Sequence, residues 1–351
     1  MSKYIFKNKE EKNELYKFIF LCGSKYVKSD VSDKRNVLKK HLENINSSYR
    51  IIILEENFSF SKSKIYLDYG DIYMRNLYDV EFLVSLLSDV IFIFHESIST
   101  GAEAGLFLGE ASNREKTCLI LPNTEAVEED KLGNFLRLSF FKGENPVKRI
   151  IYYPSVRNNI TSVNLRNLHT SFVNDSIGET LSNNINDFIK SKSRSFEIGK
   201  EEFGLNFEEV KLTVRIDPDR VLHYVAAMLS VGEIADKIFG KSMTLESVIE
   251  ILNKEMNKIL ISTYEEIKPY KFTDDPEIHF ESEKGTIQRM IGMTLYLFSA
   301  AGFMRIRKDK TYKEDKKVII EHKGKDKNGK FFFAKYSSLI EVIEEEKIRY
   351  T

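Results

Sequence analysis

Cysteine and histidine are scarce in this chain of 351 residues, which holds two of the first and six of the second. Cys22 and Cys118 lie inside apolar runs, which indicates small buried residues of a reducing compartment rather than a disulfide. The histidines do not pair at the spacing of helical metal ligands, and no Cys-x-x-Cys occurs. We therefore expect no metal site.

The chain also lacks an apolar run of the ~20 residues that a membrane-spanning helix needs. Its first residues have no signal-peptide core, so we expect a cytoplasmic protein. Neither charge is in excess, with 53 Lys and Arg against 53 Asp and Glu. Overall charge thus gives no argument for a nucleic-acid or membrane partner, and only a local patch can make one.

The remaining composition is that of a folded, soluble protein, with 42% apolar and 30% charged residues. The length allows two or three domains. Apolar runs predict strands at 18–22, 50–54, 90–94 and 117–121, and helical periodicity lies between them at 33–44, 78–88 and 103–110. This alternation predicts an α/β fold with a Rossmann-like doubly wound parallel sheet in residues 1–150.

The pattern changes in the second half of the chain. Residues 151–215 are polar and indicate a connecting region with some helix. Residues 216–351 show helical periodicity at 220–230, 244–258 and 285–303, followed by apolar strands at 318–321 and 331–334. Asn328-Gly329 between these strands is typical of a hairpin. Three helices and a hairpin predict a mostly helical, winged-helix-like C-terminal domain.

Polar residues follow the predicted strands and begin the predicted helices of the first domain. In a doubly wound sheet such residues meet at one edge, where ligands bind. The candidates at this edge are Gly23, Ser24, Glu55, Glu56, Asp79, Glu81, His95, Glu96, Ser99, Thr100, Gly101 and Glu103. Glu81 also forms a polar stripe with Ser85 and Ser88 on an otherwise apolar helix, and such a stripe needs a partner or a pocket.

Several of these residues have a purely structural interpretation as well. Asp79 and Glu81 stabilise the positive N-terminus of a helix wherever they begin one. Ser99 or Thr100 is suited to be the N-cap of the helix that holds Glu103. For His95, a histidine hydrogen-bonded within a loop is a more common outcome than a substrate contact.

A basic segment lies near the end of the chain, where residues 305–335 hold twelve Lys or Arg against five Asp or Glu. Tyr312, Tyr336 and the run Phe331–Phe333 are close by. Cations suit phosphate contacts, and aromatic rings can stack on unpaired bases. The alternative is a solvated hairpin with a phenylalanine core. The candidate nucleic-acid or partner contacts are Arg305, Arg307, Lys308, Lys325, Lys327 and Lys330.

Three sequence features together resemble a known family. They are Phe-Leu-Cys-Gly at 20–23, Glu81 eight residues before Asp89, and the segment 89–97 followed by Gly-Ala-Glu-Ala-Gly-Leu-Phe at 101–107. They resemble the nucleoside 2′-deoxyribosyltransferase-like family, and more closely the effector proteins of type II retrons, which are bacterial reverse-transcriptase defence systems. That branch places a winged helix region after the enzyme domain. The motifs cover residues 16–125, and residues 215–351 agree in general layout.

The resemblance implies an N-glycosyl hydrolase or transferase in which Glu103 is the nucleophile. Glu81 would bind sugar hydroxyls or handle protons. Effectors of this branch resemble glycohydrolases of NAD or a related nucleotide, so NAD is expected as a substrate and no cofactor is expected. The resemblance further implies an antiphage toxin that forms a homo-oligomer and is restrained by the retron reverse transcriptase and its multicopy single-stranded DNA, the msDNA.

The chain departs from the transferases of this family in one respect. It has Cys22-Gly23-Ser24 where those enzymes carry a tyrosine near the first strand, and it has an additional domain. Nucleoside salvage is thereby disfavoured, although a nucleoside deoxyribosyltransferase remains an alternative. A second alternative is a nucleotide-sensing, DNA-binding regulator without catalysis. The identity of the base and sugar, and the choice between hydrolase and transferase, stay open.

Overall fold

The computed structural model describes most of the chain in two compact units. The described residues are 3–8, 15–23, 26, 33–57, 72, 74–95, 97–122, 149–153, 172, 177–192, 198–199, 202–206, 208–209, 211–268, 272, 276–281, 286–309, 316–325 and 331–343. One unit, here the sheet unit, comprises residues 16–57 and 84–193. The other, here the helical unit, comprises residues 1–15, 58–83 and 194–351. The chain therefore alternates between the two units.

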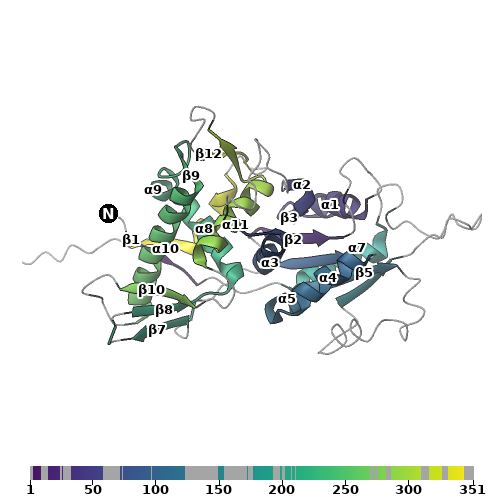
Figure 1. Cartoon of the computed structure of the whole chain (residues 1–351), viewed down its shortest axis with the longest axis horizontal. Coiled ribbons are helices and arrows are strands. Elements are labelled where there is room, and N and C mark those ends of the chain that lie inside the picture. The colour runs from purple at the N-terminus through teal and green to yellow at the C-terminus, as the bar shows by residue number, and fades with distance from the viewer. Residues whose placement is uncertain are drawn as a thin grey trace, which may run out of the picture. The chain divides into compact units, whose positions relative to one another are not determined.

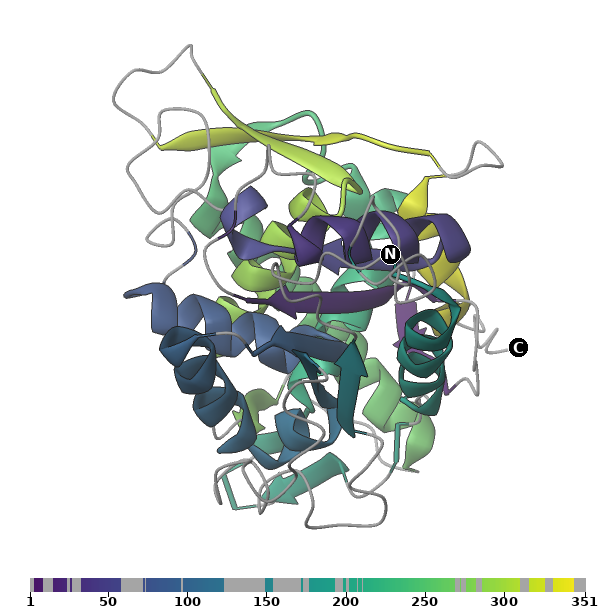
Figure 2. The ribbon, with the colours of Figure 1, turned by 90° about the vertical axis from the view of Figure 1, so that its right-hand side faces the viewer.

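The sheet unit is built on five parallel strands in the order β3-β2-β4-β5-β6 (Figure 1; Figure 2). The strands are β2 (Lys17–Cys22), β3 (Tyr49–Ile52), β4 (Val90–Phe94), β5 (Thr117–Pro122) and β6 (Ile150–Tyr153). Its helices are α1 (Lys34–Ile45), α2 (Leu54–Asn57), α4 (Ile98–Leu108), α5 (Ala111–Lys116) and α7 (Glu179–Ser191), with the last turn of α3 (Leu77–Leu87). The predicted α/β class and parallel sheet are confirmed.

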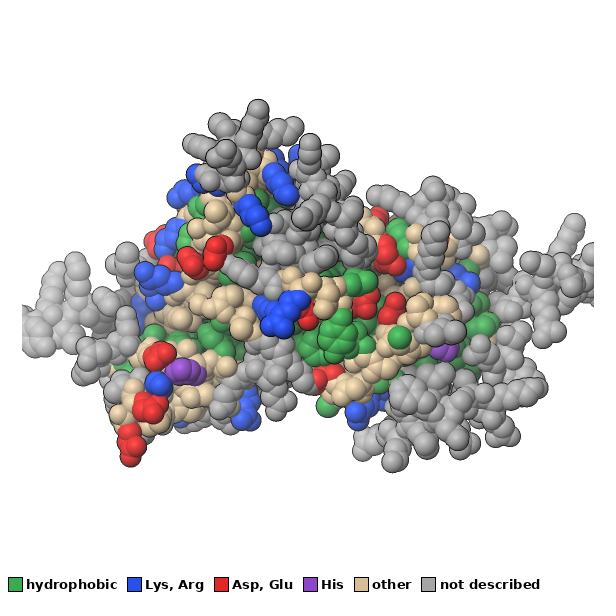
Figure 3. Space-filling model, viewed as in Figure 1, with side chains coloured by type: hydrophobic (Ala, Val, Ile, Leu, Met, Phe, Trp, Pro, Cys, Tyr) green, Lys and Arg blue, Asp and Glu red, His purple; other side chains and the backbone are tan. Residues whose placement is uncertain are grey.

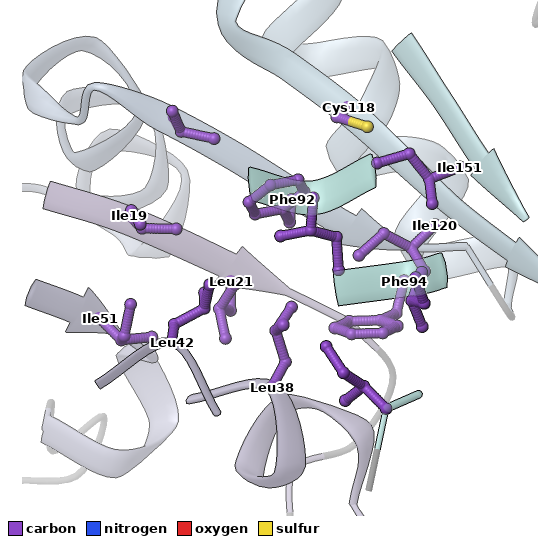
Figure 4. Close-up of a cluster of buried hydrophobic side chains, with 14 of the residues drawn as sticks. Ile19, Leu21, Leu38, Leu42, Ile51, Phe92, Phe94, Cys118, Ile120 and Ile151 are labelled. Carbon is purple, nitrogen blue, oxygen red and sulfur yellow. The ribbon is translucent and has the colours of Figure 1, made fainter. Parts of the chain in front are cut away.

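Alternate residues of these strands face opposite sides of the sheet, and both sides are buried. On one side, Ile19, Phe92 and Ile120 belong to a cluster that also holds Leu38 of α1 and Phe188 of α7 (Figure 4). On the other side, Phe20 of β2 packs edge-on against Phe107 of α4, with ring centroids 5.9 Å apart. The sheet thus lies between two helical layers, as the near-continuous apolar strands require.

The helical unit holds α8 (Pro218–Leu229), α9 (Gly232–Ala235), α10 (Leu245–Ile267) and α11 (Ile287–Ala300). β9 (Ser242–Thr244), β11 (Met304–Lys308) and β12 (Lys317–His322) form an antiparallel sheet in the order β11-β12-β9. β7 (Phe203–Asn206), β8 (Lys211–Arg215) and β10 (Glu277–Glu281) form a second sheet, in which β8 pairs antiparallel with β7 and parallel with β10. β1 (Lys3–Phe6) pairs with β13 (Ile340–Ile343) near the other end of the chain.

The strand predicted at 331–334 is wrong. Phe332–Leu339 forms a 3₁₀ helix, η6, in which Phe333, Tyr336 and Leu339 are buried. These three side chains recur every third residue, which matches the three residues per turn of this helix. The predicted hairpin turn Asn328-Gly329 lies outside the described residues, and the hairpin that the structure shows joins β11 to β12 instead.

Lys116 stabilises the sheet unit in an unusual way, because its ammonium group is buried. Its Nζ donates hydrogen bonds of 2.7 Å to the carbonyl oxygens of Leu86 and Ser88, at the C-terminus of α3. These carbonyls have no partner within the helix, and a cation there also opposes the helix dipole. Lys116 therefore joins the end of α3 to the beginning of β5.

Replacing Lys116 with Met should lower the free energy of unfolding by about 2 kcal/mol, since two buried carbonyls lose their donor. The matched control is Lys254→Met on α10, because Lys254 is exposed. Urea unfolding of both variants checks this expectation. Equal stability of the two variants would contradict the structural role of Lys116.

Candidate active site at the edge of the sheet

The strand order places a candidate site beside the ends of β2 and β4. β2 lies between β3 and β4 and pairs with both. β3 therefore extends the sheet on one side of β2, whereas β4 and the strands after it extend the sheet on the other side. In open α/β sheets, ligands bind outside the carboxyl ends of the strands at such a switch point. Gly23 follows β2 and His95 follows β4, and both therefore lie at this edge.

The helix after β4 begins earlier than the sequence predicted. Its N-cap is Ser97, whose side chain accepts a hydrogen bond from the Thr100 N–H, while the Thr100 hydroxyl accepts one from the Ser97 N–H at 3.1 Å. Neither Ser99 nor Thr100 is the cap. This reciprocal pair fixes the start of the helix at Ile98, five residues before Glu103.

Glu103 lies on the second turn of α4. Thr100 and Phe107, three residues before it and four after it, are fully buried, so Glu103 lies on the flank of the buried face. Its side chain is half-buried, and its Oε2 atom is shielded from solvent. Helical side chains tilt toward the N-terminus of their helix, which for α4 is the carboxyl edge of β4.

His95 and Gly101 lie against each other next to this helix start. The His95 N–H donates to the Ile120 carbonyl, which extends the pairing of β4 with β5 by one residue. Its Nδ1 is 3.5 Å from the Thr100 hydroxyl. A Cβ on Gly101 would lie 3.5 Å from His95 Cε1. The structure thus brings together three of the predicted site residues, His95, Thr100 and Gly101, and Glu103 follows three residues after Thr100 on the same helix.

Gly23 borders a buried arginine that sequence reasoning missed. A Cβ at Gly23 would lie 3.1 Å from Nε of Arg35, whose side chain is only 3% exposed. Arg35 donates from Nη1 to Glu55 at 2.9 Å, and its guanidinium carbon lies 4.9 Å from the centre of the Tyr26 ring. Asp33 Oδ1 is 3.8 Å from its Nε. No sequence pattern separates Arg35 from Lys34, Lys39 and Lys40 of the same helix, which are half-buried or exposed.

Tyr26 and Glu56 complete the charged group beside β2 and β3. The Tyr26 hydroxyl donates to Asn36 at 2.7 Å. Burial, with the nearby carboxylates of Glu56 and Asp33, raises the pKa of Tyr26 to about 12, so the phenol keeps its proton well above neutral pH. Glu56 forms an ion pair with Lys39 at 2.5 Å. Glu55 and Glu56 thus reach the expected edge but are held by cations of α1.

Phe172 is a second residue that the sequence did not reveal. Its ring packs edge-on against Phe94 and Tyr153, the last residues of β4 and β6, with centroids 5.4 and 5.1 Å away. Its φ of 61° lies in the left-handed region, which costs a bulky residue roughly 1 kcal/mol or more. Such strain is concentrated at functional sites in proteins, and here it lies at the carboxyl edge of the sheet.

Two residues of the polar stripe on α3, Ser85 and Ser88, have structural partners, and so has Asp79 at the start of the helix. Asp79 accepts a hydrogen bond from the Arg75 N–H at 2.9 Å, which agrees with its structural interpretation. Ser85 accepts one from Asn113, and the Ser88 hydroxyl donates to the Val84 carbonyl, both at 2.7 Å. Asp79 and half-buried Glu81 belong to the helical unit, whereas Glu103 belongs to the sheet unit. Ser24 and Glu96 lie outside the described residues.

The predicted basic contacts are on the helical unit. Arg305, Arg307 and Lys308 lie on β11, and Arg307 Nε donates to Glu321 at 2.8 Å. Lys325 Nζ lies 5.3 Å from the centre of the Phe331 ring. Lys and Arg side chains are visible around β9 and β12 in Figure 3. Lys327 and Lys330 lie outside the described residues.

Two features are absent from the described part of the chain. No group of three or more His, Cys, Asp or Glu there is placed to hold a metal ion. Within the same residues, no helix is long and apolar enough to cross a membrane.

Comparison with models of protein families identifies the family of this chain. The model of the STM3845 retron effector protein matches residues 31–305, which include α1, β4, Glu103 and α11. The chain belongs to this retron effector family. Its role is therefore that of a retron effector in defence, associated with the retron system. No curated protein matches the chain.

Arg35 gives a test of the charged group at this edge of the effector. Arg35→Met should lower the free energy of unfolding by about 2–3 kcal/mol, because Asp33 and Glu55 lose a buried cation. This value allows for the partial exposure of Glu55, which weakens its ion pair with Arg35. The control is Lys40→Met, on the exposed side of the same helix. Thermal unfolding measures both, and a loss no larger than that of Lys40→Met would contradict the assignment.

Proposed function

We propose that the sheet unit is an N-glycosidase that cleaves NAD or a related nucleotide with Glu103 as the nucleophile. The observation that carries the proposal is the position of Glu103, a partly shielded carboxylate on the second turn of α4, whose N-terminus lies at the switch point of the sheet. Membership of a retron effector family and the resemblance of residues 89–107 to nucleoside deoxyribosyltransferases support it.

The proposed chemistry needs one carboxylate and one water. An Oε atom of Glu103 attacks the anomeric carbon, the C–N bond breaks, and the base leaves with the bonding electrons. Nicotinamide leaves NAD as a neutral molecule because its ring nitrogen is cationic in the substrate, so this step needs no general acid. Water then attacks the glycosyl ester, which releases the sugar product and a proton and restores the Glu103 carboxylate.

The surroundings of Glu103 suit a nucleotide. The first turn of α4 presents the positive end of an eleven-residue helix, which favours the phosphates of a nucleotide. Gly101 has no side chain to block this turn, and His95 packs against it. In this proposal Gly23 and Ser99, on the same edge of the sheet unit, complete the substrate contacts.

We further propose that the helical unit contains a winged helix domain. Apart from the short α9 and from β10, which pairs in another sheet, the elements follow the order α8, β9, α10, α11, β11, β12. They give three long helices and an antiparallel sheet in the order β11-β12-β9, which is typical of that fold. The antiparallel pair of β11 and β12 would form the wing. Through this domain the retron reverse transcriptase and msDNA would restrain the effector, which we expect to form a homo-oligomer.

Substitution of Glu103 with Gln removes the nucleophile and nearly preserves the shape of the side chain. We expect release of base to fall at least ~1,000-fold, as for other catalytic nucleophiles, while the substrate still binds. Chromatography of NAD, NADP, nucleosides and deoxynucleotides after incubation measures the release, with and without the reverse transcriptase. The thermal shift that the substrate produces measures binding.

The control is Glu110→Gln, because Glu110 precedes α5 and lies beyond the opposite end of α4. It should release base at the wild-type rate. If the wild-type protein binds a nucleotide tightly but releases no base, the result would contradict the proposed N-glycosidase activity and favour the nucleotide-sensing regulator. Transfer of the sugar to a second base would identify a transferase instead.

A further inference from the structure

His95 lies on the side of the sheet that α4 covers. Successive residues of a strand face opposite sides of a sheet, and Phe94 belongs to the cluster on the side of α1 and α7. His95 continues the strand, because its N–H donates to the Ile120 carbonyl, so its side chain faces the other side. There a Cβ at Gly101 of α4 would lie 3.5 Å from His95 Cε1. His95 and Glu103 are therefore on the same side of the same edge.

The hydrogen bonds of Thr100 determine which nitrogen of His95 carries the proton. The Thr100 hydroxyl donates its single proton to the Ser97 carbonyl oxygen at 2.7 Å. Toward His95 Nδ1, which is 3.5 Å away, this hydroxyl can therefore only accept. A neutral imidazole with its proton on Nδ1 has a lone pair on Nε2. Nε2 of His95 is thus a proton acceptor.

Nε2 is also on the part of the ring that a ligand can reach. Nδ1 and Cε1 both face the first turn of α4. The side chain is half-buried, so it is partly open to solvent. Because α4 covers the Nδ1 side of the ring, the open part is the side of Nε2. An accepting nitrogen therefore stands beside the first turn of the helix that carries Glu103.

The carboxylates that follow the neighbouring strand are less suited to take a proton on this side. Glu55 and Glu56 form ion pairs with Arg35 at 2.9 Å and with Lys39 at 2.5 Å. Both cations belong to α1, whose core residues pack on the opposite side of the sheet from α4. A carboxylate next to a cation favours its charged form and resists protonation. His95 has no such cation among the contacts that hold its ring.

Glu103 and His95 lie on either side of Thr100. Helical residues three positions apart are neighbours, so the side chain of Glu103 lies next to that of Thr100. It also tilts back toward the first turn of α4. Two groups that act in turn on one sugar carbon must be roughly 5 Å apart rather than in contact. One intervening side chain gives a separation of this order, which leaves space for the anomeric carbon and a water molecule.

We propose that His95 is the general base that activates water in the second step of the proposed reaction. Nε2 takes a proton from the water while the water oxygen bonds to the anomeric carbon. The bond from that carbon to the Glu103 oxygen breaks, and its electrons return to the carboxylate. The imidazolium then passes the proton to solvent. This inference rests on the proposed N-glycosidase activity and deepens it by naming the group that receives the proton.

The test is a rapid-quench measurement of base release by His95→Ala. The substrate is the one that the wild-type protein cleaves fastest among NAD, NADP, nucleosides and deoxynucleotides. Formation of the ester needs no proton acceptor, so the variant should release about one equivalent of base per site at the wild-type rate. Later turnover should be at least ~100-fold slower, because the water is no longer activated. Mass spectrometry should then find the glycosyl group on Glu103.

Azide distinguishes a general base from a residue that only supports α4. The azide ion attacks the ester without losing a proton, so it should restore turnover of His95→Ala and yield a glycosyl azide. The matched control is His41→Ala, because His41 is also a half-buried histidine of the sheet unit. Its Nε2 lies 2.8 Å from the Ser182 hydroxyl, between α1 and α7. His41→Ala should turn over at the wild-type rate and should not respond to azide.

Thermal unfolding shows whether His95→Ala is folded. If it is not, His95→Gln takes its place, because glutamine keeps a polar side chain but cannot take up the proton, and the same burst is expected. Equal turnover of the His95 and His41 variants would overturn the proposal. Slow release of the first equivalent, without an ester on Glu103 or a response to azide, would overturn it too. Both results leave the wild-type activity in place, whereas a wild-type protein that releases no base contradicts the N-glycosidase itself.

Discussion

The parallel pairing of β2 with both β3 and β4 is the constraint on which the candidate site depends. It puts the reversal of the strand order between β2 and β4 and brings the residues after these strands to one edge. The strands can occupy the middle of the sheet because they are apolar on both faces: Phe18 to Leu21 and Val90 to Phe94 are all buried. Glu103 owes its place at this edge to the helix that follows β4.

Buried polar contacts then fix the ends of the elements around that edge. Ser97 and Thr100 set the start of α4, and Arg35 connects α1 to Glu55 beside Gly23. Lys116 ties the end of α3 to the start of β5, and the Phe18 N–H donates to Asp89 at 2.7 Å across the start of the sheet. A carboxylate nucleophile must be held within a fraction of an ångström of its target, and rigid elements with fixed ends provide this.

The sequence was most informative where a pattern is local. An apolar run between polar residues gave β4 with its correct bounds, and the alternation of strands and helices gave the parallel sheet. The motifs around Glu103 led to the retron effector family, which the family match confirmed. Features that depend on residues far apart in the sequence could not be predicted. β1 pairs with β13 across nearly the whole chain, and Arg35 is buried among Gly23, Tyr26 and Glu55. The run of phenylalanines in η6 resembles a strand in the sequence.

The central claim is that Glu103 forms a bond to the sugar. Its most direct test is mass spectrometry of the protein after incubation with a 2′-fluoro-substituted NAD, because fluorine next to the anomeric carbon slows the hydrolysis of a glycosyl ester and lets it accumulate. The account predicts a single added glycosyl group on the peptide that contains Glu103, and no such addition in Glu103→Gln. Release of nicotinamide with no adduct, or an adduct on another carboxylate, would contradict it.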